Sequence, residues 1–196
     1  MTTPPLVTRA EASDYTEASR HADVLAFING LRALGDPRLH IEDFGSTPEG
    51  RLLPLLVLSA QGHFSPEAAH ASGLPVVVVI PGIHAGEVEG KEASLMLVRD
   101  ILAGKHGDVL EKMTLVVVPL FNADGNDRIS SENRKLDISN FSGQLGPDSG
   151  VGTRVNAAGI NLNRDYMRQE APEMRLMQTG VAQRWNAHLT IDCHAT

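Results

Sequence analysis

Residues 76–87 read Val-Val-Val-Val-Ile-Pro-Gly-Ile-His-Ala-Gly-Glu, an unbroken β-branched run that stops at Pro81-Gly82. A run that is apolar at every position predicts a strand buried on both faces of a sheet. The apolar residues that follow recur at helical spacing and predict a helix over about 87–103: Leu95, Val98, Ile101 and Leu102. A buried strand followed at once by an amphipathic helix is typical of α/β proteins.

Further helices and strands are predicted on both sides of this unit. Ser13 or Asp14 can begin a helix that runs to about Leu34, because apolar residues between them follow the helical period. A last helix begins at Pro172, since proline is favoured in the first turn. The remaining regular segments are predicted strands: Leu39–Phe44, Leu52–Leu58, Leu115–Val118 and Leu189–Cys193.

The order of these elements predicts an α/β fold, in which a mixed, largely parallel central sheet carries helices on both faces. Residues 45–50 form the hairpin loop between the first two strands, and Pro54 indicates an edge position for the second. No repeat or linker divides the chain, so we expect one domain over residues 1–196. Residues 121–160 lack periodicity and are rich in Gly, Asn, Asp and Ser, which predicts a long active-site loop.

The composition limits which kinds of partner and which cellular compartment we expect for this protein. The net charge is −7 and the sequence has no basic run, which argues against nucleic acid. Cys193 is the single cysteine, so neither an intrachain disulfide nor a multi-cysteine zinc site is expected. The longest apolar run, residues 74–81, is too short to cross a membrane. Residues 1–14 lack the apolar core of a secretory signal, so we expect a cytoplasmic protein.

Three residues with metal-binding side chains follow the ends of two predicted strands. His84 and Glu87 lie in the turn after residues 76–80, where open α/β sheets place their ligands. His194 follows the last strand, on the same face as Asp192. An H-x-x-E pair alone is more often a loop histidine beside a solvated glutamate. Combined with a histidine from a neighbouring strand, it predicts a zinc site with three protein ligands and an open position.

Between these segments lies Gly159-Ile160-Asn161-Leu162-Asn163-Arg164-Asp165-Tyr166. The Arg164 guanidinium beside the Asn163 amide forms a planar set of donors suited to binding a carboxylate. The alternative is a loop held by bonds from its side chains to its own backbone, and the pair by itself does not separate the two.

Taken in order along the chain, the H-x-x-E pair, the Asn163-Arg164 pair and the strand-end His194 resemble the motifs of the zinc carboxypeptidase family. Two further segments are similar to motifs of that family: Gly45-Ser46-Thr47-Pro48-Glu49-Gly50-Arg51 and Phe121-Asn122-Ala123-Asp124-Gly125. The resemblance extends from about Tyr15 to His194 and, as an ordered set of motifs, it is specific.

The resemblance implies a role for each matched residue. His84, Glu87 and His194 would hold one zinc ion. Asn163 and Arg164 would bind the terminal carboxylate of the substrate.

The family also uses an upstream arginine to polarise the scissile carbonyl and stabilise the oxyanion. We assign this role to Arg154, with Arg134 as the alternative. Asn161 stands where the family commonly has an aspartate that orients the first zinc histidine, and its amide oxygen can accept the same imidazole proton without charge. Asp165-Tyr166 replaces the usual Asn-Phe.

In this family a general-base glutamate, a mobile tyrosine and much of the specificity pocket follow the strand-end histidine. The chain ends two residues after His194. The resemblance therefore implies that the C-terminal part of the domain is missing and that residues 1–196 alone are inactive.

The sequence thus predicts a zinc-dependent metallocarboxypeptidase acting on a peptide or a small carboxylate-bearing substrate. One alternative is a zinc deacylase of N-acyl amino acids, similar to aspartoacylase or succinylglutamate desuccinylase, and another is a non-catalytic module that holds zinc. The early Glu-Gly-Arg hairpin and the long interval between Glu87 and His194 favour the peptidase. The oligomeric state stays open.

Overall fold

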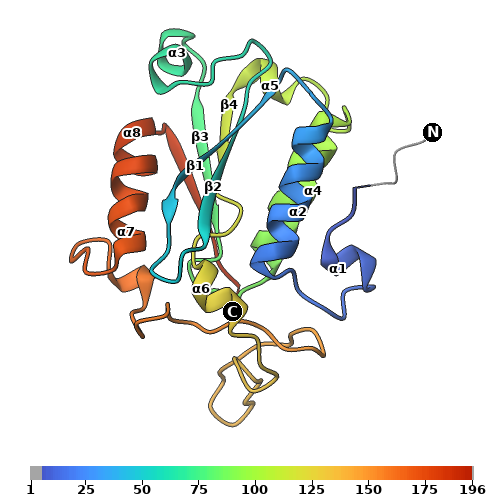
Figure 1. The fold of residues 1–196 in the computed structure, drawn as a ribbon, viewed down its shortest axis with the longest axis vertical. Coiled ribbons are helices and arrows are strands. Elements are labelled where there is room, and N and C mark those ends of the chain that lie inside the picture. Colours follow the sequence, from blue (N-terminus) through green and yellow to red (C-terminus); the bar gives the residue numbers. More distant parts are fainter. Residues whose placement is uncertain (1–5, 196) are drawn as a thin grey trace.

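A five-stranded mixed sheet forms the centre of the protein, which a computed structural model describes over residues 6–195. The strands are β1 (Leu39–Ser46), β2 (Leu52–Leu58), β3 (Val76–Pro81), β4 (Thr114–Val117) and β5 (Leu189–Cys193). Their order in the sheet is β1-β2-β4-β3-β5. β3 is parallel to β4 and β5, whereas β1 and β2 are antiparallel to their neighbours. Three adjacent parallel strands therefore end at the same edge of the sheet (Figure 1).

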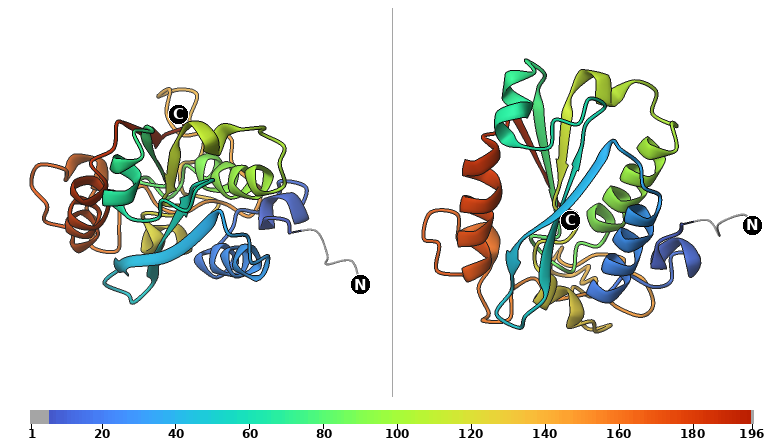
Figure 2. Two further views of the ribbon diagram at one scale, coloured as in Figure 1. Left: turned by 90° about the horizontal axis from the view of Figure 1, so that it is seen from above. Right: turned by 45° about the horizontal axis from the view of Figure 1, so that its top comes forward.

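Helices lie on both faces of this sheet, which confirms the predicted fold class. The α-helices are α1 (Arg9–Ala12), α2 (His21–Ala33), α3 (Pro66–Ala71), α4 (Glu89–Leu102), α5 (Val109–Lys112), α6 (Ala123–Asp127), α7 (Pro172–Met177) and α8 (Gln183–Trp185). α2 and α4 pack together on one side, and α7 and α8 lie on the other (Figures 1 and 2). Within residues 6–195, no helix has the length and apolar character needed to cross a membrane.

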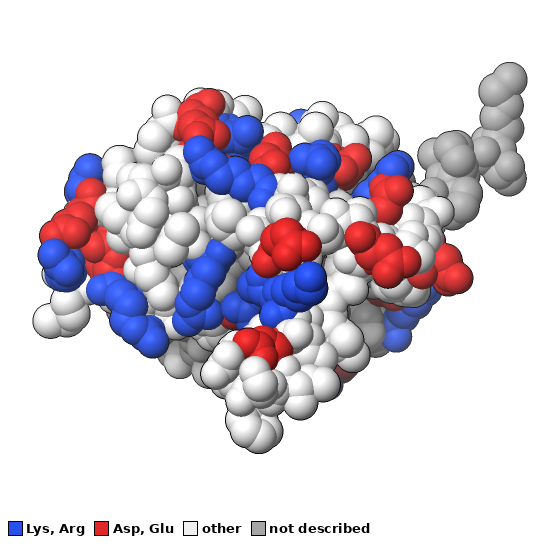
Figure 3. All heavy atoms as spheres, turned by 90° about the horizontal axis from the view of Figure 1, so that it is seen from below, with Lys and Arg blue, Asp and Glu red and all other residues white. Residues whose placement is uncertain are grey.

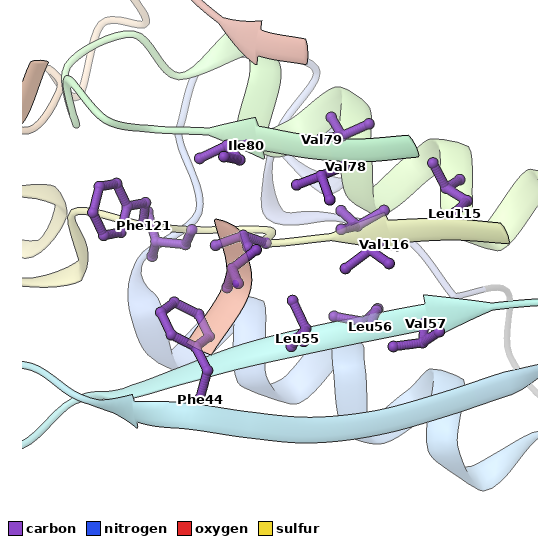
Figure 4. Packing of buried hydrophobic residues seen from close by; sticks show 14 of the residues in the cluster. Phe44, Leu55, Leu56, Val57, Val78, Val79, Ile80, Leu115, Val116 and Phe121 are labelled. Atoms are coloured by element: carbon purple, nitrogen blue, oxygen red, sulfur yellow. The ribbon is translucent and has the colours of Figure 1, made fainter. Parts of the chain in front are cut away.

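The hydrophobic core fills the space between the sheet and its helices. β3 is buried at every position, as its sequence predicts. Side chains of β2, β3 and β4 gather with Phe44 and Phe121 in one cluster (Figure 4). Full burial of a Val or Leu side chain stabilises the folded state by about 1.5–3 kcal/mol relative to leaving it exposed. This packing therefore fixes β3 and, with it, the turn that follows its carboxyl end.

The helix predicted to begin at Ser13 or Asp14 is wrong at its start, because the backbone is not helical there. Thr8 caps the short helix α1 through a capping box with Glu11. Asp14 and Tyr15 then adopt left-handed backbone angles, with φ of 53° and 63°, which no helix can include. The longer helix α2 starts only at His21.

The edge position inferred from Pro54 is also wrong. β2 pairs with β1 on one side and with β4 on the other, so β1 is the edge strand. Pairing with β4 is restricted to Leu56–Leu58. The missing amide hydrogen of Pro54 therefore lies outside the part of β2 that is paired on both sides.

Two motifs that are distant in the sequence meet at one buried carboxylate. Asp124, in α6, is fully buried. It accepts hydrogen bonds from the Thr47 hydroxyl at 2.6 Å and the Arg51 guanidinium at 2.8 Å, both in the connection between β1 and β2. These hydrogen bonds therefore hold the connection between β1 and β2 against α6, near the carboxyl edge of the sheet.

The segment after α6 is irregular throughout. Residues 128–161, all of which the structure describes, contain three isolated β-bridges and no helix: Ser130–Val151, Lys135–Gln144 and Asp137–Ser142. The irregular segment predicted over residues 121–160 thus includes one short helix, α6, near its start.

Candidate metal centre

The metal-binding residues proposed from the sequence lie on two neighbouring parallel strands. His84 and Glu87 occupy the turn between β3 and α4, and His194 directly follows β5. β3 and β5 pair in parallel register through Pro81 and Cys193. Because both strands end at this point, their following turns must lie side by side.

The carboxylate of Glu87 lies between the two imidazole rings. Its Oε1 is 2.9 Å from Nδ1 of His84, and its Oε2 is 3.0 Å from Nδ1 of His194. The two rings are 5.0 Å apart between centroids. His84 and Glu87 are buried, whereas the His194 side chain is 32% exposed. The group is thus closed on one side and accessible at His194.

The donor set fits a zinc ion. One ligand atom from each of the three residues lies within 4.8 Å of the others. Ligand atoms held tetrahedrally at zinc bond lengths are roughly 3.3 Å apart. The Glu87 oxygens lie slightly closer than this to the two imidazole nitrogens, at 2.9 and 3.0 Å. Two imidazole nitrogens and one carboxylate oxygen leave a fourth position open, as catalytic zinc sites require.

The protonation states of the two most buried residues suit metal binding. Burial lowers the pKa of His84, which favours the neutral imidazole. Burial alone would raise the pKa of Glu87, but the Ala195 amide and the His194 imidazole hold it below its ordinary value. A neutral imidazole and a charged carboxylate are the forms that ligate a metal.

Asn161 supports the far side of the first histidine, as the resemblance implied. Its Oδ1 lies 3.1 Å from Nε2 of His84 and also accepts the backbone N–H of Asn163 at 3.0 Å. The following residues form a short 3₁₀ turn, Leu162–Arg164, whose Leu162 is fully buried. This turn therefore lies beside His84 and carries Asn163 and Arg164.

The predicted carboxylate-binding pair lies at different depths. Nδ2 of Asn163 is 3.4 Å from Nε2 of His194, so Asn163 reaches the centre directly. Arg164 is exposed, and its guanidinium donates to the carbonyl of Asn163 at 3.1 Å. The Arg164 side chain is therefore the more accessible member of the pair.

Both arginines considered for the oxyanion role approach Glu87. Nη1 of Arg134 is 3.1 Å from Oε1 of Glu87, and Nη1 of Arg154 is 3.6 Å from the same atom. The Arg134 side chain is 13% exposed and that of Arg154 is 46% exposed. Figure 3 shows the molecule from below, where Lys and Arg side chains lie close together at several places, with Asp and Glu side chains between them.

Gln144 fixes Arg134 in place, a contact that the sequence analysis missed. The Gln144 amide accepts from Nε of Arg134 at 2.9 Å and donates to the carbonyl of Gly86 at 2.6 Å. A Cβ at Gly86 would come within 2.4 Å of Arg134, so glycine is needed for this approach. Gln144 lies in an irregular loop without periodicity, and no local pattern could have identified it.

A family model of zinc carboxypeptidases matches residues 24–194. No curated protein matches the chain by sequence. Among solved structures, a metallo-carboxypeptidase from Burkholderia cenocepacia is 21% identical with a TM-score of 0.67, and the alignment covers 93% of this chain and 42% of that chain. Thrombin activatable fibrinolysis inhibitor is 18% identical with a TM-score of 0.69, covering 98% of this chain and 50% of that chain.

A metallo-carboxypeptidase from Pseudomonas aeruginosa, in complex with (2-guanidinoethylmercapto)succinic acid, is 23% identical with a TM-score of 0.57. That alignment covers 90% of this chain and 39% of the other. These likenesses show the carboxypeptidase fold, and the chain spans about half the length of these proteins or less. The family match extends over most of the chain and includes His84, Glu87 and His194. This chain therefore belongs to the zinc carboxypeptidase family.

Proposed function

We propose that this chain binds one zinc ion through His84, Glu87 and His194 and takes part in removing C-terminal residues from peptides. The convergence of the Glu87 carboxylate with both imidazoles at the end of β3 and β5 is the observation that carries the proposal. Family membership supports the same reaction class.

When bound, zinc polarises a carbonyl and lowers the pKa of a water molecule to about 7. The surrounding residues would bind and orient the substrate. The Asn163 amide approaches His194, and the Arg164 guanidinium contacts the Asn163 carbonyl; together they would bind the terminal carboxylate of a peptide. Recognition of that carboxylate would restrict the reaction to the chain end.

The oxyanion role belongs to an arginine that faces the reacting carbonyl. The sequence assigned this role to Arg154, with Arg134 as the alternative. The shorter distance to Glu87 and the contact with Gln144 favour Arg134, because a fixed donor needs less reorganisation during the reaction. A kinetic comparison of the two variants separates these assignments.

Metal analysis tests the first half of the proposal. The purified protein should contain one zinc per chain, and Glu87→Gln should lose it. Retention of zinc in Glu87→Gln would show that the metal lies elsewhere.

The substrate class requires a second experiment, with a protein that carries this chain and is active. Peptides with a free C-terminus should be hydrolysed and N-acyl amino acids should not. The reverse preference would favour the deacylase alternative, which uses similar ligands. Zinc binding without hydrolysis of either substrate would favour the non-catalytic module.

A further inference from the structure

A fully buried carboxylate outside the metal centre holds the segment of residues 156–165. Glu173 lies in the first turn of α7, and both of its oxygens are 3.2 Å from Nδ2 of Asn156. The other side of the Asn156 amide accepts the backbone N–H groups of Ala158 at 3.0 Å and Ile160 at 2.9 Å. Glu173 therefore orients the amide that closes this loop.

The far end of the same segment is held by a second buried carboxylate. Asp165 is 2% exposed. It accepts the backbone N–H of Glu170 at 3.0 Å and of Ala171 at 2.8 Å, just before α7. Both ends of residues 156–165 are thus tied to the start of one helix, which packs against the sheet.

Burial of a carboxylate opposes folding unless its hydrogen bonds compensate. Burial raises the pKa of Glu173, and the nearby charge of Asp124 adds to this effect. An apolar side chain would fill the same space without that desolvation. The position of Glu173 is better explained by the group that it orients than by its contribution to stability.

We propose that Glu173 and Asp165 are positioning residues of the metal centre: by fixing residues 156–165, they hold Asn161 against His84. The Asn161 side chain lies within this segment and reaches Nε2 of His84 at 3.1 Å. Groups behind a metal ligand set the orientation of the imidazole and typically change metal affinity by about 10–100-fold when removed. This inference rests on the zinc site of the proposed function.

The test measures zinc affinity by competition with a chromophoric chelator. Glu173→Ala should weaken zinc binding by about tenfold. Glu173→Gln keeps an oxygen that accepts from Asn156, so its affinity should stay at the wild-type value. If Glu173 acts through Asn161, the double variant Glu173→Ala, Asn161→Ala should bind zinc no more weakly than Asn161→Ala alone.

Met177→Ala is the matched control, because Met177 is buried in the same helix and makes no hydrogen bond to the described part of the loop. It should lower the Tm and leave zinc affinity unchanged. If Glu173→Ala does not fold, Asn156→Ala removes the same contact from the other side. Wild-type zinc affinity in the folded variants, or fully additive losses in the double variant, would overturn the inference. A wild-type protein without zinc would instead overturn the proposed function.

Discussion

Oδ1 of Asn161 lies 3.1 Å from Nε2 of His84, while Nδ1 of the same ring faces Glu87. An amide oxygen only accepts hydrogen bonds, so with a metal bound at Nδ1 the imidazole proton would lie on Nε2 and be donated to Asn161. Zinc carboxypeptidases commonly carry an aspartate at the position of Asn161. Because the amide of Asn161 is neutral, it leaves the His84 imidazole a weaker base than an aspartate would.

Asn161→Asp should therefore raise zinc affinity by about tenfold. The aspartate keeps an acceptor for both His84 and the backbone N–H of Asn163, and it adds a negative charge beside the imidazole. Competition titration at fixed pH measures the change. Equal or weaker zinc binding by Asn161→Asp would show that Asn161 does not act on the metal through His84.

Removal of either histidine ligand should abolish tight zinc binding. Two protein ligands cannot replace the three of a catalytic zinc site. We expect metal analysis to find less than one zinc in ten chains for His84→Ala or His194→Ala, if affinity falls by about 10²-fold or more. His106→Ala provides the control, because His106 is exposed and distant from the three ligands in sequence. Zinc retained by folded His84→Ala would exclude this site.

The strands could be predicted from the sequence because their signals are local. The β-branched run of β3 is buried on both faces, and β2 and β5 occupy the residues expected. A parallel arrangement of β3 and β5 follows from the α/β pattern and brings His194 to His84. The position of β2 inside the sheet was not predictable from Pro54, because strand order depends on pairing that is not local.

Residues that depend on the irregular segment were harder to predict. Arg134 reaches Glu87 because Gln144 and Gly86 direct its side chain, and these three residues come from two separate loops. Neither the hydrophobic periodicity nor the spacing of motifs predicts a contact between side chains of two separate loops. The sequence therefore left Arg134 and Arg154 as alternatives, and both lie near the same carboxylate.

Replacement of the three arginines should have different kinetic effects in an active protein that contains this chain. Arg164→Ala should mainly raise KM, because a carboxylate is bound equally in the ground state and the transition state. The arginine that faces the oxyanion should mainly lower kcat, by roughly 10²–10³-fold. A collapsed kcat in Arg134→Ala with a normal kcat in Arg154→Ala would assign the role to Arg134, and the converse would assign it to Arg154.

Lys91 should make the stability of the protein depend on pH. It is 1% exposed in α4, and its ammonium donates to the carbonyl of Ser19 and, at 2.7 Å, to the Asn126 side chain. Burial lowers its pKa from 10.5 to about 8, although the neighbouring Glu92 opposes this change. Between pH 8 and 10.5 the unfolded chain therefore binds more protons than the folded protein.

The free energy of unfolding contributed by Lys91 should thus rise with pH across that window and stay constant below pH 8. The rise is at most about 3.5 kcal/mol, since one pKa unit corresponds to about 1.4 kcal/mol. Urea unfolding at several pH values measures it, with Lys91→Met as the comparison. The same pH dependence in Lys91→Met and wild type would show that another group is responsible.

Most carboxylates near the candidate metal centre are engaged in other contacts or exposed, although Oδ1 of Asp192 has no hydrogen-bond partner among the described residues. Glu87 is assigned to the metal. Glu92 accepts hydrogen bonds from the amide and hydroxyl of Ser19 at 2.6 and 2.8 Å, and Glu89 is exposed on α4. Asp192 contacts Nε2 of His194, on the opposite side of the ring from Glu87.

We therefore expect the protein of residues 1–196, loaded with zinc, to release no C-terminal residues at a measurable rate. Peptide hydrolysis needs a group that takes a proton from water and delivers it to the leaving amine, worth about 10²–10⁴-fold. Asp165, the other nearby carboxylate, accepts two backbone N–H groups before α7 and is not free for that task. Mass spectrometry of peptides incubated with the zinc-loaded protein measures release, and His84→Ala controls for contaminating peptidases. Zinc-dependent release that His84→Ala abolishes would contradict the prediction and require a general base among these residues, for which Asp192 would be the first to replace.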